Sequence, residues 1–339
     1  MAPETHFPTP LVVPPLSTHK QTFILLHGRG SSATKFGPAL LSTPIPAVSA
    51  GRTPATPPAT PPAPGPASTL AALFPHAKFV FPTAVRSRAS VYARSVINQW
   101  FDCWHADDDP DRKPWLMAEG LPRTTAFLHD LLRREAGLVG GAGNVVLGGL
   151  SQGCAASLVA AMLWEGERLG AVVGMCGWLP FKAAVEVAAG VGRDAGQCDD
   201  DDDDDDGFDP FERSPVESGL DPFGHSDATP LDGDADGGTE TSDDSCSRAT
   251  IGLREELELP RVSPLRGQPS ITATPVFFGH GVEDDKVPVH LGRESADCLA
   301  SIGVHASWHE YEGLGHWYSE AMLMDLVDFL QKHTGWGTE

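Results

Sequence analysis

Residues 144–157 read NVVLGGLSQGCAAS, and this stretch decides the fold class of the chain. An apolar, β-branched run ends at two glycines, Ser151 follows, and small residues typical of a helix then begin. The segment 149–153 is a G-x-S-x-G motif, which occurs at a tight turn from strand to helix where larger flanking side chains would clash. The motif in this context predicts that Ser151 is a nucleophile. A serine that caps a helix N-terminus is the alternative interpretation.

Short apolar runs and helix-like stretches alternate along the rest of the chain. We expect strands at residues 21–27, 77–82, 144–150, 170–178, 274–281 and 306–313, and helices at residues 115–136, 152–168, 289–302 and 317–333. Several runs have no polar alternation, as in parallel strands buried on both faces. The pattern predicts an α/β fold with a mostly parallel central sheet and helices on both faces. Ligands of such sheets bind at the carboxyl ends of the strands.

Two segments differ from the rest in composition. Residues 44–68 are rich in Pro, Ala and Thr, which favours extended and poorly packed backbone. Residues 192–247 are centred on a run of eight Asp and hold few apolar side chains. Their negative charges repel one another, and they offer little apolar surface for a core. We therefore expect a single domain over residues 1–339 with disordered inserts at 44–68 and 192–247. Residues 249–270 regain Leu and Ile and are expected to be partly ordered.

The net charge of −22 at pH 7 belongs mainly to one segment, because residues 199–244 hold 19 of the 46 acidic residues and one of the 24 basic residues. No basic stripe with interleaved aromatic residues indicates a nucleic-acid partner. No stretch approaches 18 uninterrupted apolar residues, and the start lacks the pattern of a signal peptide. The six cysteines have no C-x-x-C spacing. These features predict a cytoplasmic protein with reduced thiols, no transmembrane segment and at most transient contact with a membrane surface.

A nucleophilic serine needs a base, and His316 is the best-placed candidate. It lies in a Gly-flanked turn after the expected strand 306–313, where it could take the proton of Ser151 and return it to a leaving group. His309 lies inside that strand, and His280 is expected to have a packing role near the preceding turn. The position after a strand therefore favours His316.

The serine also needs an acid that orients the imidazole and stabilises its cation. Glu283, Asp284 and Asp285 follow the expected strand 274–281. All three carboxylates stand at the right point of the chain order nucleophile, acid, histidine. The order alone does not choose among them.

A glycine-rich loop, residues 28–32, follows the expected strand 21–27. One of its backbone N–H groups, together with the N–H of Gln152, could bind a developing oxyanion. Arg29 would act here through its backbone, so its charge is no sign of phosphate or carboxylate binding. An ordinary strand-to-helix turn is the alternative interpretation.

Taken together, these residues resemble the acyl-protein thioesterase and carboxylesterase family, the small lidless branch of the α/β-hydrolases. The resemblance is carried by the blocks ILLHGRG (24–30), FVFPTAVRSR (79–88), QWFDCW (99–104), LGGLSQGCAAS (147–157), CGWLPF (176–181), and HGVEDDKVP (280–288) with YEGLGH (311–316). It covers nearly all of the chain outside the two inserts. It implies an α/β-hydrolase fold and hydrolysis of carboxylic esters or thioesters through an acyl-enzyme, with no cofactor.

The resemblance also implies roles for particular residues. The family pattern H-G-x-x-D-x-x-V-P makes Asp284 the acid, and the backbone amides of Arg29 and Gln152 form the oxyanion hole. The substrate-binding residues implied in the same way are Trp178, Leu179 and Trp100. Cys154 replaces the glycine usual after S-Q-G, which could narrow the acyl pocket, and Trp317 stands where a small polar residue is common.

We therefore expect a serine esterase or thioesterase that acts on S-acylated proteins, lysophospholipids or simple esters. One alternative is a small-ester carboxylesterase without protein substrates. Another is an inactive hydrolase-fold interaction protein whose acidic insert serves as a docking loop for basic partners. No H-E-x-x-H or comparable ligand spacing indicates a metal.

Overall fold

The computed structural model describes residues 6–46, 67–104, 109–191, 242–260 and 268–337. These residues belong to a compact unit formed by residues 1–192 and 240–339. A second unit, residues 193–239, lies outside the described residues. Most of the expected acidic insert and most of the Pro-rich insert therefore lie outside them too.

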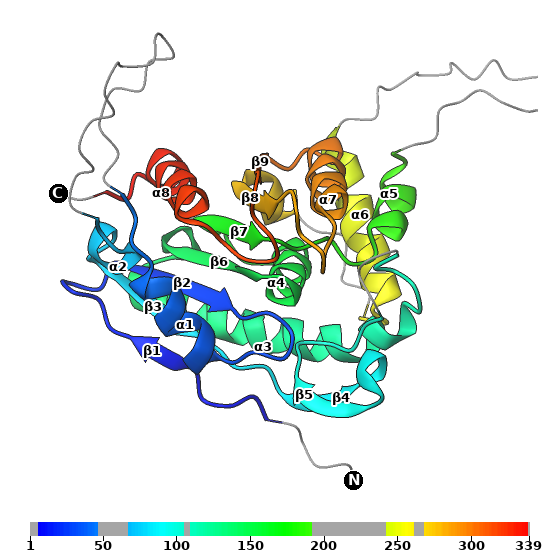
Figure 1. The fold of residues 1–339 in the computed structure, drawn as a ribbon. Helices are drawn as coiled ribbons and strands as arrows, with labels where there is room; N and C mark the ends of the chain where they lie inside the picture. Colours follow the sequence, from blue (N-terminus) through cyan, green and yellow to red (C-terminus); the bar gives the residue numbers. More distant parts are fainter. Residues whose placement is uncertain (1–5, 47–66, 105–108, 192–241, 261–267, 338–339) are drawn as a thin grey trace, which may run out of the picture. The chain divides into compact units, whose positions relative to one another are not determined.

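The described residues form a seven-stranded sheet with the order β1-β3-β2-β6-β7-β8-β9 (Figure 1). Its strand β1 is antiparallel to β3, and all other neighbouring pairs are parallel. The mostly parallel sheet predicted from the sequence is thus confirmed. The strands are β1 (Leu11–Val13), β2 (Gln21–Leu26), β3 (Ala77–Phe81), β6 (Val145–Leu150), β7 (Ala171–Met175), β8 (Val276–Gly281) and β9 (Ala306–Tyr311).

Helices cover both faces of this sheet (Figure 1). On one face the core includes α1 (Ala33–Ser42), α2 (Leu70–Leu73) and α8 (Glu320–Thr334). On the other face it includes α3 (Trp115–Val139), α4 (Gln152–Met162), α5 (Lys182–Ala189), α6 (Ser242–Glu256) and α7 (Val289–Ser301). Short 3-10 helices lie at η1 (Ser90–Tyr92), η2 (Ala142–Asn144) and η3 (Ser270–Ala273).

The central strands contribute to both cores, which explains their continuous apolar runs. In β2, Phe23 and Leu25 belong to the core on one face, whereas Ile24 and Leu26 belong to the core on the other. Successive side chains of a strand point to opposite faces, so a strand covered on both sides has few positions that face water and is mainly apolar. Helix α4 is likewise buried along its whole length.

A two-stranded sheet, β4 (Arg86–Ala89) and β5 (Ser95–Asn98), stands apart from the main sheet. The connection between its antiparallel strands contains Ala93 and Arg94, both with positive φ. The sequence pattern did not predict this hairpin, because its strands are polar and largely exposed. The chain that leaves β5 runs on into the site described below.

Ordered elements lie at the edges of both expected inserts. Helix α6 begins at Ser242, inside the range 192–247 that was expected to be disordered, and Cys246 is fully buried. A Cβ on Gly252 would collide with the side chain of Ala188 in α5, so the two helices are in close contact. Ile45 forms an isolated β-bridge with Ser68 at the two ends of the Pro-rich segment. A few apolar side chains such as Cys246 and Ile45 are therefore ordered at the edges of segments whose average composition gives no core signal.

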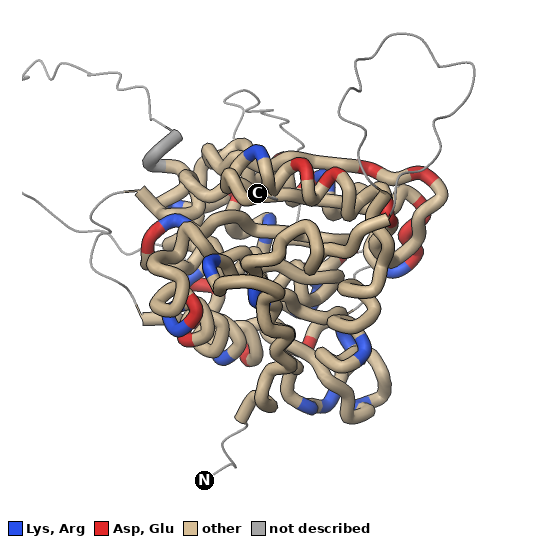
Figure 2. The backbone as a smooth tube through the Cα atoms, turned by 90° about the vertical axis from the view of Figure 1, so that its left-hand side faces the viewer, with Lys and Arg blue, Asp and Glu red and all other residues tan. Residues whose placement is uncertain are grey.

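Basic and acidic residues are interspersed over many elements of the described chain (Figure 2). The cysteines within the described ranges are free thiols and all are buried. Within the same ranges, no helix has the length and apolar character needed to cross a bilayer.

Candidate active site

Ser151 lies at the turn between β6 and α4, as the G-x-S-x-G motif predicts. Its backbone has φ 59° and ψ −124°, a strained conformation for a residue with a side chain, which costs about 1–3 kcal/mol. A Cβ on Gly153 would lie 2.5 Å from the carbonyl oxygen of Leu26, and one on Gly149 would lie 2.7 Å from the same oxygen. Only glycine therefore fits on either side of the serine.

Ser151 opens into a cavity of about 460 Å³. The cavity receives residues that follow the carboxyl ends of five neighbouring strands, which is where ligands of parallel sheets bind. Ser151 and His316 both line it, so the fold brings together two candidates that are far apart in the sequence. The lining residues are Gly28, Arg29, Ser31, Phe36, Tyr92, Leu150, Ser151, Gln152, Trp178, Asp285, Lys286, Val287, His316 and Trp317.

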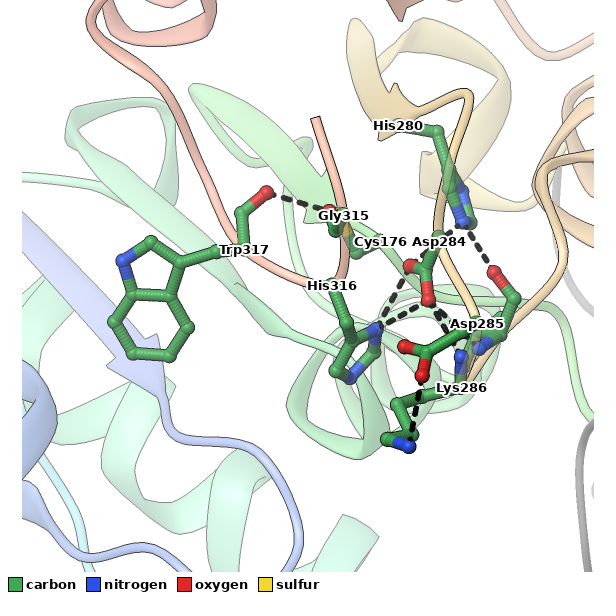
Figure 3. A network of polar contacts seen from close by, with 9 residues as sticks. Cys176, His280, Asp284, Asp285, Lys286, Gly315, His316 and Trp317 are labelled. Atoms are coloured by element: carbon green, nitrogen blue, oxygen red, sulfur yellow. Dashed lines mark hydrogen bonds and ion pairs between the residues drawn. The ribbon is translucent and has the colours of Figure 1, made fainter. Parts of the chain in front are cut away.

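His316 is paired with Asp284 (Figure 3). The Nδ1 atom of His316 lies 2.7 Å from Oδ2 and 2.9 Å from Oδ1 of the carboxylate. Asp284 is buried, whereas Asp285 is exposed and pairs with Lys286 at 3.0 Å. Because Nδ1 donates to the carboxylate, Nε2 is the imidazole nitrogen left for a proton transfer. Of the three candidate acids, Asp284 is the one that contacts the histidine.

Asp284 is surrounded by hydrogen-bond donors. The backbone amides of Lys286 and Val287 donate to Oδ1, each at 2.9 Å, and Nε2 of His280 lies 3.2 Å from Oδ2. Burial raises the pKa of the Asp284 carboxyl, but the hydrogen bonds from His280, His316 and the Val287 amide outweigh it and hold the pKa well below its usual range. Asp284 is therefore ionised at neutral pH.

His280 is the site residue whose contact the sequence analysis missed. Its expected packing role is only part of its environment, because the ring also contacts Asp284. A signal was present in the sequence: His280 lies near the end of a buried strand, four residues before the acid. The sequence does not distinguish such a histidine from an ordinary core histidine, because its contact with Asp284 depends on the shape of the turn between the two residues.

Cys176, His280 and Asp284 are the one group within the described ranges whose ligand atoms could meet at a metal ion, lying within 4.8 Å of one another. The Cys176 thiol and Nε2 of His280 already have other partners. The Cys176 thiol donates to the carbonyl of Trp317 at 3.2 Å, and His280 Nε2 donates to the carbonyl of Val287 at 2.8 Å. Burial raises the pKa of the Cys176 thiol to about 12, whereas a metal needs the thiolate. This chemistry fits a hydrogen-bond network better than a metal site.

The glycine-rich loop after β2 passes beside Ser151. A Cβ on Gly28 would lie 3.4 Å from the Cβ of Ser151 and 3.9 Å from its Oγ. The amide of Ser31 donates to the carbonyl of Gly28 at 3.1 Å, and Gly30 has φ +79°, as at the third position of a type II turn. The Arg29 side chain turns to the carbonyl of Cys103 at 3.3 Å and lies 5.1 Å from the ring of Tyr92.

His27 ties this loop to the rest of the core. Its Nδ1 donates to the carbonyl of Gly28 at 2.7 Å, and its Nε2 accepts from the amide of Ala84 at 3.1 Å. These roles require the neutral ring. Burial lowers the pKa of His27 to about 4, so the ring is neutral near pH 7.

The segment after β5 holds both this loop and the start of α4. Trp100 Nε1 donates to the carbonyl of His27 at 2.8 Å. The Gln152 side chain accepts from the amide of Trp100 at 3.0 Å and donates to the carbonyl of Phe101 at 2.8 Å. One short segment therefore positions the neighbourhoods of both expected oxyanion donors.

The residues expected to bind substrate occupy different places. Trp178 lines the cavity. Trp100 is fully buried and is not among the lining residues, and the same holds for Leu179, whose amide donates to Ser295 Oγ at 2.8 Å. Both lie in sequence blocks next to the site, but their side chains turn into the core.

Cys154 also lies outside the cavity lining. A Cβ on Gly174 would lie 2.7 Å from its sulfur, and one on Gly177 would lie 2.5 Å from it. The thiol therefore fills space that two glycines leave open at the end of β7. The expectation that Cys154 could narrow the pocket is not supported by this placement.

The mixed sheet, the strained serine turn and the Asp284–His316 pair define an α/β-hydrolase. The chain belongs to the Phospholipase/Carboxylesterase family, whose sequence profile matches residues 63–198 and 259–334.

The chain is also similar to proteins named acyl-protein thioesterase 1. It is 22% identical to that of Gibberella zeae over 329 residues, covering 95% of this chain and 94% of the relative. It is 31% identical to that of Yarrowia lipolytica over 107 residues, covering 32% of this chain and 45% of the relative. Among solved structures, acyl-protein thioesterase 2 of Zea mays has a TM-score of 0.55 at 20% identity and covers 96% of this chain and 99% of its own. SOBER1 of Arabidopsis thaliana has a TM-score of 0.54 at 16% identity, with 92% and 98% covered. At these identities the structural likeness concerns the fold.

Proposed function

We propose that this chain is a serine hydrolase that cleaves carboxylic esters or thioesters through an acyl-enzyme at Ser151. The observation that carries the proposal is the Asp284–His316 pair, with Nδ1 and Oδ2 2.7 Å apart, on the cavity that Ser151 also lines. A strained serine on a strand-to-helix turn and a histidine oriented by an ionised carboxylate are the parts that nucleophilic acyl transfer needs.

In the first half of the proposed reaction, Ser151 Oγ attacks the carbonyl carbon of the substrate and its proton passes to Nε2 of His316. The carbonyl oxygen becomes an oxyanion. Asp284 stabilises the imidazolium through the hydrogen bond to Nδ1. When the tetrahedral intermediate collapses, the bond to the thiolate or alkoxide breaks, and the leaving group takes the proton from His316.

In the second half, water attacks the acyl-enzyme and gives a proton to His316 Nε2. Collapse of the second intermediate releases the carboxylic acid and returns the proton to Ser151 Oγ. In both halves the backbone amides of Arg29 and Gln152 are the proposed oxyanion donors, and each donor of this kind contributes about 10²–10³ in rate. Support comes from the loop of Arg29, which passes beside Ser151, and from Gln152, whose amide lies in the first turn of α4 and has no intrahelical acceptor.

We further propose that the acyl group is apolar and long, and that S-acylated proteins or lysophospholipids are the substrates. Apolar and aromatic side chains, among them Phe36, Leu150 and Trp178, form part of the cavity lining and offer an apolar surface to an acyl chain. The relative from Gibberella zeae that aligns over nearly the full length is named an acyl-protein thioesterase. A small-ester carboxylesterase is the alternative, and it predicts faster turnover of acetyl than of palmitoyl esters.

The test uses the Ser151→Ala variant and p-nitrophenyl esters of increasing chain length. Wild-type protein is expected to turn over the esters and to be labelled by a fluorophosphonate, and the variant to do neither. The side chain of Ser157 is buried and bonded to Gly153, so Ser157→Ala serves as a matched control that keeps activity. Labelling or turnover retained in Ser151→Ala would refute the assignment of the nucleophile.

A further inference from the structure

His280 lies at the end of β8 and is completely buried. Its Nε2 atom is 2.8 Å from the carbonyl oxygen of Val287 and 3.2 Å from Oδ2 of Asp284 (Figure 3). Oδ2 is also the atom that His316 Nδ1 approaches at 2.7 Å. Two imidazoles, one near the end of β8 and the other in the loop after β9, thus meet at one carboxylate oxygen.

The neighbours of His280 determine where its hydrogen lies. A backbone carbonyl and an ionised carboxylate both accept hydrogen bonds, so Nε2 must carry the hydrogen. Nδ1 is buried and has no hydrogen-bond partner in the described part of the chain. A second hydrogen on Nδ1 would leave a buried N–H without an acceptor, which is costly. The contacts therefore select the neutral ring protonated on Nε2.

Packing keeps the ring in this orientation. A Cβ on Gly292 of α7 would collide with Nδ1, so the helix approaches closely at its glycine. The ring of Trp308 on β9 lies on another side, with 5.8 Å between ring centroids. A buried ring enclosed in this way cannot turn its Nε2 away from Asp284 without moving α7 or β9.

The other ionisable groups around the ring are compensated. Glu310 of β9 is paired with Arg293 of α7. The thiol of Cys176 faces the same carboxylate, and burial raises its pKa to about 12, so it is neutral. Asp284 is ionised, and no Lys or Arg side chain of the described residues lies at hydrogen-bond distance from its carboxylate.

We propose that His280 is a positioning residue of the hydrolase: it shares its Nε2 hydrogen between the carbonyl of Val287 and Oδ2 of Asp284, and so holds the carboxylate ionised and oriented toward His316. The inference rests on the proposed function, because it concerns the same acid and base. The contact of His280 Nε2 at 3.2 Å holds Oδ2 at the point where His316 meets it. The backbone amides of Lys286 and Val287 fix the other oxygen.

The test compares His280→Gln with His280→Met. Glutamine can place an N–H near the position of Nε2, whereas methionine fills similar space and has no donor. A hydrogen bond to a charged group has an effect equivalent to about 10–100-fold in rate, so the Met variant should lose about that factor in kcat with little change in KM. The Gln variant should restore most of kcat. The matched control is His309→Met on the neighbouring strand, whose ring contacts Phe277 rather than Asp284.

Two further measurements separate positioning from a purely structural role. In His280→Met the midpoint of the acidic limb of the pH profile of kcat/KM should move to higher pH. The reason is that the Asp284 carboxylate, with one hydrogen-bond donor fewer, stabilises the protonated His316 imidazole more strongly. In the wild-type protein, ¹⁵N NMR should show His280 as a neutral ring protonated on Nε2. This second measurement needs no variant to fold and no substrate.

The outcomes are distinct. An NMR spectrum with the hydrogen of His280 on Nδ1 would overturn the inference, and so would a Met variant with the kcat and pH profile of the Gln variant. Absence of Ser151-dependent turnover in wild-type protein would instead refute the proposed function. The tautomer of His280 seen by NMR would still test its contact with Asp284. Loss of kcat in Met, recovery in Gln and the Nε2 tautomer together support the positioning role.

Discussion

Replacing Gly153 with Ala tests whether the serine turn depends on close contact with β2. The new Cβ would lie 2.5 Å from the carbonyl oxygen of Leu26 and 2.8 Å from that of His27. Both neighbours are backbone atoms of a central strand end, so no side chain can rotate away. To reach even a tight 3.0 Å contact, the first turn of α4 and β2 would have to separate by about 0.5 Å.

The expected consequence concerns both stability and rate. Overpacking of this kind destabilises by about 1–3 kcal/mol. A displacement of a nucleophile approaching 1 Å lowers the rate by about 10²-fold, so a shift of half that size should reduce kcat/KM by about tenfold or more. Urea unfolding followed by fluorescence gives the first quantity, and p-nitrophenyl ester turnover gives the second.

Gly137→Ala is the matched control for this substitution. Gly137 is exposed on α3, and a Cβ there would meet nothing within 4 Å. Alanine in a helix is favoured over glycine by about 0.5–1 kcal/mol, so this variant should be slightly more stable and fully active. A Gly153→Ala protein as stable and as active as wild type would refute the reasoning about the serine turn.

Three further predictions follow from the contacts of the site. Asp284→Asn should lower kcat by about 10⁴-fold because the His316 imidazole loses its ionised partner. Asp285→Asn, at the exposed pair with Lys286, should change kcat less than about threefold. Equal losses of kcat in the two variants would contradict the assignment of Asp284 as the acid. Trp100→Phe removes the donor to the buried carbonyl of His27 and should cost about 1–3 kcal/mol in urea unfolding, with KM nearly unchanged because the ring is outside the cavity; a large rise in KM would restore its expected role in binding. Burial lowers the pKa of His27 from 6.5 to about 4. Below pH 6.5 the unfolded chain therefore binds a proton at His27 that the folded chain does not accept until about pH 4. As the pH drops through this window, the free energy of unfolding should fall by about 3 kcal/mol. A His27→Gln variant should lack that part of the slope, and an unchanged slope would show that His27 is not its source.

Local patterns predicted the fold well where burial on both sides left a clear signal. The six predicted strands are present, and the central ones are mainly apolar because helices cover both of their faces. The hairpin β4–β5 and the helix α6 were missed for the opposite reason. Their residues are largely polar, and only contacts with distant segments, such as that between Gly252 and Ala188, show that they are ordered.

The candidate site shows the same division. The G-x-S-x-G motif placed Ser151 on its turn because the steric demand for glycine is local. The residues alone left Glu283, Asp284 and Asp285 open, and the resemblance to a family pointed to Asp284. The contact with His316 at 2.7 Å distinguishes Asp284 physically.

The sequence by itself determined six of the strands, the serine turn and the set of reactive residues after those strands, because these depend on periodicity and on the volume of neighbouring side chains. Only the tertiary structure decided which way those side chains face. In the folded chain, the side chain of Trp100 packs in the core, Nε2 of His280 lies next to Asp284, and Trp178 lines the cavity. The physical reason is that such orientations depend on where other strands and helices stand, and that arrangement is a property of the whole sheet rather than of any one segment.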